Sequence, residues 1–369
     1  MTSEAMILNK DLITLSSDLA MTTPEDKSYN CGTKIFELKE SCPVAVMING
    51  NLDFEEISLE TLIGEFGKTI DYDEIKTVEG VKDEFIKYLS ENTESTSIDE
   101  YLSEILDEFK DEICYQISEN GFNQTLSTYK QNKLSDYIMD YKNFSDEFFN
   151  LIPDDEDKSQ YNTEIWKIFS HYLSFEGTGI IFAGFDLDNF HPSYFEINLH
   201  CNNDGDIIYD EVDSKTNCKE PVIKVFAINE EAYAFLTGVS NDFEEYIKSR
   251  IKHLNEIFLF EFNEKLTSKN YDSKEIEYIL SVVNLYFKDS YSNICENIEN
   301  YKLNSLDEIS ESSGYLPKTI LWQLASNLIE FTALKQKFSS ENETVSIETE
   351  GVFLTKNNGI EWIKKNMKV

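Results

Sequence analysis

Short apolar runs alternate with polar turn formers over the first fifty residues, a pattern that predicts β-strands. The turn formers fall at residues 9–11, between the first two runs, and at residues 49–51, after the last run. Asn, Asp and Gly favour turns because they tolerate or stabilise a reversed backbone. We therefore expect two consecutive hairpins, the last run being continuous enough for a strand buried on both faces. The expected strands are residues 5–8, 12–16, 34–38 and 43–48.

Apolar residues at intervals of three and four, the spacing of a helix face, dominate two later blocks of the chain. Ser58 is a candidate N-cap for a short helix that ends near Gly67, since its hydroxyl can accept a bond from a free backbone N–H. The expected longer helical stretches are residues 81–119 and 123–151, broken by polar links around residues 94–97 and 120–121, and then residues 164–175, 242–265, 274–301 and 317–337. The expected later strands are residues 179–185, 193–199, 206–211, 222–228, 344–355 and 360–363.

The order strands, helices, strands, helices, strands predicts an α+β fold. Neither strand block can easily bury its apolar faces alone, because a sheet needs a second layer packed against it. We expect two packed antiparallel sheets in the middle and helices on both outer faces, which is a four-layer αββα sandwich. Residues 1–369 then form one interleaved domain rather than two.

Charge and composition narrow the classes of function. The chain has a net charge of −38, from 70 acidic and 32 basic residues. A surface this negative repels nucleic acids and anionic membranes, so we expect neither as a partner. No apolar run approaches the roughly 18 residues of a membrane span, and the first residues lack the pattern of a secretory signal. We therefore expect a cytoplasmic protein.

Cysteine usage agrees with that compartment and gives no sign of a metal centre. The 6 cysteines are scattered without a CxxC pair, which suits reduced thiols in a cytoplasm. A zinc site could be imagined from His191, His200, Cys201 and Cys218, but their spacing matches no common ligand pattern. We expect no metal and no cofactor.

Thr2 is the strongest candidate for a catalytic residue. Removal of Met1 would leave Thr2 with a free amine, so that one residue carries both a hydroxyl nucleophile and a base. The α-amine has an ordinary pKa of about 7.7–8.0, and desolvation or a nearby cation would lower it. Such a site needs no histidine, which suits a chain with only 4 of them.

Four positions within residues 2–53 resemble the start of proteasome β-subunits and of the bacterial proteasome-like peptidase that works with an unfoldase ring. They are Thr2 at the start, Asp18 after the second strand, Lys34 opening the third and Gly50 in the turn after the fourth. Later stretches look like an uncharacterised bacterial branch of the same superfamily, the N-terminal-nucleophile hydrolases. These stretches are residues 181–185, 325–329, 332–335 and 357–363.

The resemblance implies a threonine-type peptidase or amidohydrolase that cleaves a peptide or small amide through an acyl-enzyme on Thr2. Lys34 would depress the pKa of the Thr2 amine and stabilise developing negative charge, and Asp18 would pair with Lys34. The backbone N–H of Gly50, or of Asn49 beside it, would supply the oxyanion hole. The resemblance also implies a homo-oligomer and leaves room for a separate unfoldase or regulatory partner.

The chain departs from the family in two places. The family places a Ser in a Gly-Ser-Gly turn that should fall near residues 225–241, where this chain has none; Ser240 and Asp242 are the candidate replacements. Residues 71–176 are far longer than the helical pair of a compact family member, so we expect an enlarged, acidic helical insertion within the domain.

Two other functions stay open. A catalytically inactive proteasome-like subunit would serve assembly, sensing or binding, as proteasome α-subunits do. An acidic binding module without chemistry would not bring Thr2, Asp18 and Lys34 together. A distance well beyond about 5 Å between the Thr2 and Lys34 side chains would favour the binding module.

Overall fold

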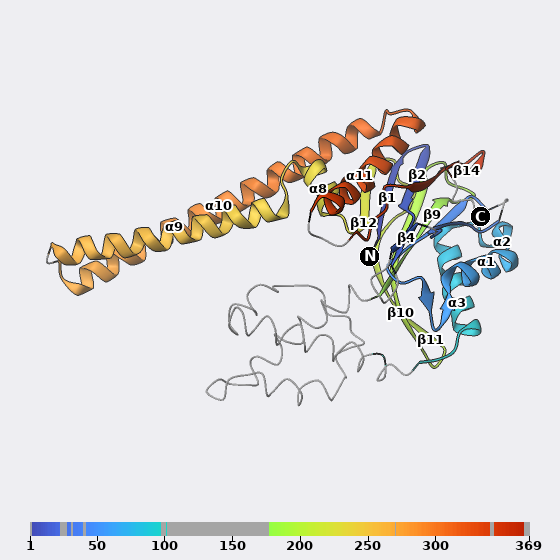
Figure 1. The fold of residues 1–369 in the computed structure, drawn as a ribbon, viewed down its shortest axis with the longest axis horizontal. Coiled ribbons are helices and arrows are strands. Elements are labelled where there is room, and N and C mark those ends of the chain that lie inside the picture. The colour runs from blue at the N-terminus through green and yellow to red at the C-terminus, as the bar shows by residue number, and fades with distance from the viewer. Residues whose placement is uncertain are drawn as a thin grey trace.

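The computed structural model describes residues 2–22, 28–30, 32–39, 42–96, 101, 177–269, 271–339 and 343–364. Most of the expected insertion at residues 71–176 lies outside these residues, together with the expected helices at 123–151 and 164–175. In the described part the chain has a mixed α and β fold with two five-stranded antiparallel sheets, and helices pack against each sheet (Figure 1).

The first sheet joins the two ends of the chain. Its strands are β1 (Ser3–Asn9), β2 (Leu12–Asp18), β12 (Val222–Ala227), β13 (Thr349–Thr355) and β14 (Gly359–Lys364). Their order, β12-β1-β2-β13-β14, places the N-terminal hairpin between strands from the later sequence. The expected turn of that hairpin is confirmed, because Asn9 accepts bonds from the N–H groups of Asp11 and Leu12 at 3.0 and 3.1 Å.

The second sheet contains β5 (Ile35–Glu37), β6 (Val44–Asn49), β9 (Thr178–Phe185), β10 (Pro192–Asn203) and β11 (Asp206–Lys215). Their order is β11-β10-β9-β6-β5, so β5 is an edge strand. The expectation for β6 is confirmed: five of its residues are fully buried because the first sheet covers one face and helices cover the other. Two short ribbons complete the strands: β3 (Ala20–Thr22) with β4 (Ser28–Asn30), and β7 (Asp53–Phe54) with β8 (Ile57–Ser58).

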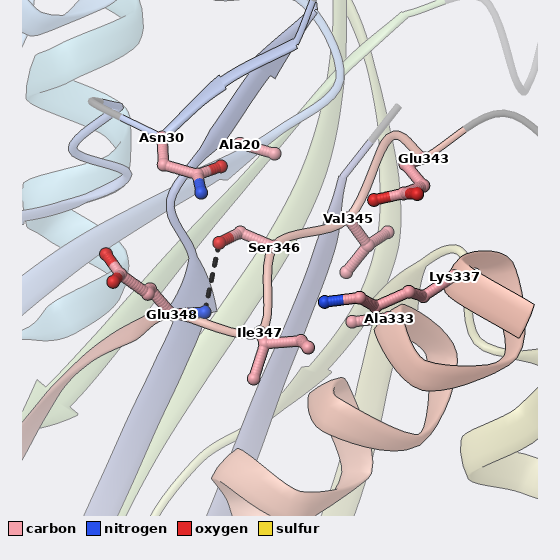
Figure 2. Close-up of a pocket in the computed structure, with 9 residues that line it drawn as sticks. All are labelled: Ala20, Asn30, Ala333, Lys337, Glu343, Val345, Ser346, Ile347 and Glu348. Carbon is pink, nitrogen blue, oxygen red and sulfur yellow. Dashed lines mark hydrogen bonds between the residues drawn. The ribbon is translucent and has the colours of Figure 1, made fainter.

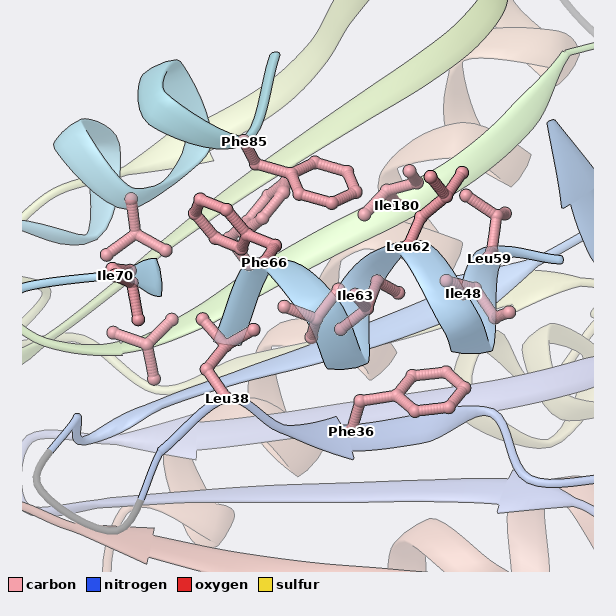
Figure 3. Packing of buried hydrophobic residues seen from close by; sticks show 14 of the residues in the cluster. Phe36, Leu38, Ile48, Leu59, Leu62, Ile63, Phe66, Ile70, Phe85 and Ile180 are labelled. Atoms are coloured by element: carbon pink, nitrogen blue, oxygen red, sulfur yellow. The ribbon is translucent and has the colours of Figure 1, made fainter. Parts of the chain in front are cut away.

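Helices α1 (Leu59–Thr69), α2 (Tyr72–Ile75) and α3 (Val78–Asn92) lie on the second sheet. Ser58 caps α1 as expected, its hydroxyl accepting the N–H of Thr61 at 3.2 Å. Figure 3 shows Leu62 and Phe66 of α1 packing among apolar side chains from β5, β6 and β9. A separate apolar cluster fills the space between the two sheets, and it includes Met6, Leu15, Met47 and Ile181.

Helices α8 (Glu230–Thr237), α9 (Asn241–Ser268), α10 (Ser273–Ser313) and α11 (Lys318–Phe338) belong to the side of the first sheet. Leu328 and Ile329 of α11 pack with Ala5 and Ile7 of β1 in a third apolar cluster. The hairpin of α9 and α10 extends far from the sheets (Figure 1). None of the helices in the described ranges combines the length and the apolar character needed to cross a membrane.

Two expectations for the later sequence need correction. Helix α10 continues to Ser313 instead of ending near residue 301, because Leu306 and Ile309 pack against the cluster beneath α11. Residues 344–348 are a loop rather than the start of a strand. The side chain of Gln336 in α11 accepts hydrogen bonds from the N–H groups of Thr344 and Val345, each at 3.0 Å. These N–H groups therefore bond to a helix side chain, where a strand would bond to a neighbouring strand.

Candidate active site

Thr2 lies immediately before β1 at one end of the first sheet. The N–H of Ile228 donates to the carbonyl of Thr2 at 3.0 Å, and the Ser3 hydroxyl donates to the carbonyl of Ile228 at 3.0 Å. These bonds fix the start of β1 against the end of β12. Thr2 is only 4% exposed in the chain that carries Met1.

Asp18 is the last residue of β2 and comes level with the first residues of β1 through the register of the hairpin. The Thr2 hydroxyl lies 2.8 Å from Asp18 Oδ1, and the Ser3 N–H donates to the same oxygen at 3.2 Å. Asp18 Oδ2 accepts the N–H groups of Ala20 and Ser346, each at 3.0 Å. Because three backbone N–H groups point at this buried carboxylate, its negative charge is stabilised in place.

Lys34 reaches the same point from the other sheet. It precedes β5, which packs against β2 and β13 across the space between the sheets. Its ammonium lies 2.5 Å from Asp18 Oδ1 and donates to Thr2 Oγ1. The side chain is 2% exposed, a depth at which a lysine needs such partners. The structure therefore brings Thr2, Asp18 and Lys34 together, which a binding module without chemistry does not require.

Glu4 is a member of this cluster that the sequence analysis missed. It lies two residues after Thr2 and so on the same face of β1. Its Oε1 accepts from the Thr2 hydroxyl and is 3.5 Å from Lys34 Nζ, while its Oε2 has no hydrogen-bond partner within the described part of the chain. Burial, with a smaller contribution from the charge of Asp18, raises the pKa of Glu4 to about 8, although Lys34 opposes the shift.

Glu350 of β13 is the second residue missed. Glu4, Ser17 and Glu350 are cross-strand neighbours in one row over β1, β2 and β13. Glu350 Oε1 accepts the backbone N–H groups of Lys34 and Ile35 at 2.8 and 3.1 Å, and the Ser17 hydroxyl at 3.3 Å. This side chain anchors the start of β5 to the first sheet and thereby positions Lys34. The sequence signal for both missed residues was a Glu inside an otherwise apolar strand.

Gly50 follows β6 at the end of the second sheet where Lys34 lies. The N–H of Ile48 donates to the carbonyl of Lys34 at 2.9 Å, and Gly50 is two residues farther along. Gly50 has φ +88°, a conformation that residues with a side chain rarely adopt. Asn49, the last residue of β6, pairs with Gly179 of β9.

Ser240 and Asp242, the candidate replacements for the family's serine cluster, lie at the start of helix α9. The Ser240 hydroxyl accepts the N–H of Phe243 at 3.3 Å as the N-cap, and Asp242 is in the first turn. Within the described residues, no hydrogen bond or ion pair joins either of them to Thr2. Glu4 lies beside the Thr2 hydroxyl, where these residues were expected.

A cavity of about 380 Å³ lies between the ribbon of β3 and β4, the end of α11 and the loop that follows α11 (Figure 2). Two of its lining residues, Ala20 and Ser346, are the ones whose backbone N–H groups bond to Asp18 Oδ2. The Ser346 hydroxyl also accepts the N–H of Glu348 at 3.0 Å, which holds the loop after α11 in shape. Two residues that line the cavity therefore bond to Asp18 Oδ2, whereas Thr2 contacts Asp18 Oδ1.

The chemistry of the cluster is that of a hydroxyl held between acid groups and a cation. Such a hydroxyl can lose its proton to a neighbouring base, and the cation stabilises the resulting negative charge. No group of three or more His, Cys, Asp and Glu side chains in the described part of the chain is placed to hold a metal ion. The chain matches no model of a known protein family and none of the curated proteins.

Proposed function

We propose that this chain is an N-terminal threonine hydrolase of the proteasome type that cleaves a peptide or small amide through an acyl-enzyme on Thr2. The observation that carries the proposal is the setting of the Thr2 hydroxyl, which lies 2.8 Å from Asp18 Oδ1 and accepts a bond from Lys34. Apolar clusters between two sheets and under helices on each outer side support an αββα sandwich of the N-terminal-nucleophile type.

Removal of Met1 would give Thr2 a free amine and open it to a substrate. The Thr2 oxygen loses its proton to a base beside it and bonds to the carbonyl carbon of the substrate. The C–N bond of the substrate then breaks, the leaving amine takes up the proton, and water hydrolyses the ester on Thr2. Lys34 stabilises the negative charge on the attacking oxygen, and Asp18 holds Lys34 in place.

The negative charge on the substrate oxygen requires a donor that is already oriented before the reaction. We assign this part to the backbone N–H of Gly50, in the turn that starts at Asn49. The support is its position, two residues after the bond between Ile48 and Lys34, and its positive φ. A positive φ turns the chain out of the extended conformation after β6, and Gly50 lies just beyond Asn49, the last residue of β6 that pairs with β9.

One observation favours the catalytically inactive alternative. In the chain that carries Met1, Thr2 is 4% exposed and its hydroxyl already contacts Glu4, Asp18 and Lys34. A buried hydroxyl with three polar neighbours can serve as a purely structural element. The two functions differ in whether Met1 is removed and whether Thr2 then reacts.

Intact-mass spectrometry followed by treatment with a β-lactone probe tests the proposal. We expect the mass of a chain without Met1, and a covalent adduct that is lost in Thr2→Ala. The matched control is Thr14→Val, a buried threonine of β2 that lies outside the cluster and whose hydroxyl has no hydrogen-bond partner within the described residues. Retention of Met1 in every copy, or equal labelling of Thr2→Ala and wild type, contradicts the proposal.

A further inference from the structure

Glu4 is not needed as a counter-ion for Lys34. Lys34 lies 2.5 Å from Asp18 and 3.5 Å from Glu4, and one carboxylate is enough to balance its charge. A fully buried acid that is not required for charge balance and leaves one oxygen without a partner is costly to the fold. Such a group at the nucleophile calls for a role in the chemistry.

The hydroxyl of Thr2 has a single proton to donate and two acids within reach. Asp18 Oδ1 already accepts from Lys34 and from the backbone of Ser3, and Asp18 Oδ2 accepts two further N–H groups. Glu4 has no backbone donor among its hydrogen-bond partners in the described residues, and its Oε1 faces the Thr2 hydroxyl. The less occupied acceptor of the two is therefore Glu4.

We propose that Glu4 is the base that accepts the Thr2 hydroxyl proton during acylation. This inference rests on the proposed function and assigns one of its steps. The Oγ–H bond of Thr2 breaks, its proton moves to Glu4 Oε1, and the Thr2 oxygen bonds to the substrate carbonyl. Glu4 then gives this proton to the leaving amine. In deacylation Glu4 accepts a proton from the attacking water and returns it to Thr2 as the ester breaks.

The surroundings of Glu4 suit a base that works near neutral pH. The charged groups that face it are Lys34 and Asp18, together with the amine that Thr2 gains when Met1 leaves. On β12 its cross-strand partner is the uncharged Phe226, and on β2 it is Ser17, with Glu350 one strand beyond. With a pKa raised to about 8, Glu4 is a stronger base than an ordinary carboxylate and ionises close to working pH.

The test compares rates of β-lactone adduct formation between pH 6 and 9 in wild type, Glu4→Gln and Glu244→Gln, all freed of Met1. Glu244 is a matched control, because it is a buried acid of α9 paired with Lys248 and Lys302 and remote from β1 in sequence. We expect the wild-type rate to rise with pH to a plateau. Glu4→Gln should react at least about a hundredfold more slowly, the usual contribution of a general base, and Glu244→Gln should follow wild type.

Three other results would overturn the role of Glu4 or the proposed function, or decide the test with a second variant. Labelling of Glu4→Gln at the wild-type rate with the same pH midpoint overturns the role of Glu4, leaves Thr2 as nucleophile and makes its amine the base. Absence of labelling in wild type without Met1 overturns the proposed function itself. If Glu4→Gln does not fold, Glu4→Asp carries the test: a shifted pH midpoint supports the inference, and an unchanged one overturns it.

Discussion

The backbone N–H of Lys34 donates a 2.8 Å hydrogen bond to the side chain of Glu350, which lies 316 residues later in the chain. The bond ties the edge strand of one sheet to β13 of the other. Because the same carboxylate oxygen also accepts the N–H of Ile35, the direction in which β5 begins is fixed. The position of the Lys34 ammonium therefore depends on a strand near the end of the sequence.

Glu350→Ala tests this dependence. We expect a loss of about 2–5 kcal/mol in the free energy of unfolding, since two backbone N–H groups of Lys34 and Ile35 lose a buried acceptor. Urea denaturation measures the loss, and β-lactone labelling should fall with it because Lys34 is no longer held. Glu65→Ala, which removes an exposed pair with Lys68, should change stability by less than about 1 kcal/mol. Equal stabilities of the two variants would argue against the anchoring role.

Lys34→Met should destabilise the fold strongly. It leaves the buried Asp18 without its cation, and breaking a buried ion pair from one side costs roughly 3–5 kcal/mol. Adding Asp18→Asn to the same chain removes the stranded charge, so the double variant should recover much of the stability. A double-mutant cycle by urea denaturation measures the coupling. Additive effects of the two substitutions would show that the pair does not act as a unit.

The raised pKa of Glu4 predicts that the stability of the fold depends on pH. Its pKa is raised from 4.5 to about 8 on folding, so the folded chain binds more protons than the unfolded chain between these values. The free energy of unfolding should therefore fall as pH rises from about 4.5 to 8, by at most about 5 kcal/mol at 1.36 kcal/mol per pKa unit. Below pH 4.5 both states are protonated, and above pH 8 both are ionised, so the effect of Glu4 is constant there.

Urea denaturation of wild type and Glu4→Gln across that pH range measures this slope. A chain that retains Met1, prepared with methionine aminopeptidase inhibited, avoids a second titrating group on Thr2. We expect the difference in stability between the two proteins to shift in favour of Glu4→Gln as pH rises. A difference that does not change with pH would mean that Glu4 is not desolvated in the folded chain.

Gly50→Ala should lower stability by about 1–3 kcal/mol, because alanine at a positive φ is strained. Space is not the limit, since an added Cβ would lie 3.4 Å from the carbonyl oxygen of Gly177. The matched control is Gly64→Ala in helix α1, where an added Cβ meets nothing within 4 Å and should add up to about 1 kcal/mol. Thermal denaturation separates the two effects, and a stabilised Gly50→Ala contradicts the backbone argument.

Local features of the chain could be predicted from its sequence. The turn at residues 9–11, the N-cap at Ser58 and the doubly buried β6 depend on a few neighbouring residues or on one apolar run. The nearness of Thr2 and Asp18 also follows from local information, since a tight hairpin brings both ends of its strands together. Lys34 was a candidate because its position in the sequence resembles that of a lysine in proteasome β-subunits. Its contact with Thr2 depends on the packing of the two sheets and could not be predicted from local sequence.

Only the tertiary structure decided the remaining parts of the site. Glu4 reads as one acid among 70, and it becomes a buried neighbour of Thr2 only when the second sheet covers that face of β1. Glu350 and the loop at Ser346 act on residues more than three hundred positions earlier. Sequence patterns report the period of a strand or helix and the chemistry of a turn. Which acids lose their water, and which distant strands become neighbours, is set by the packing of the layers.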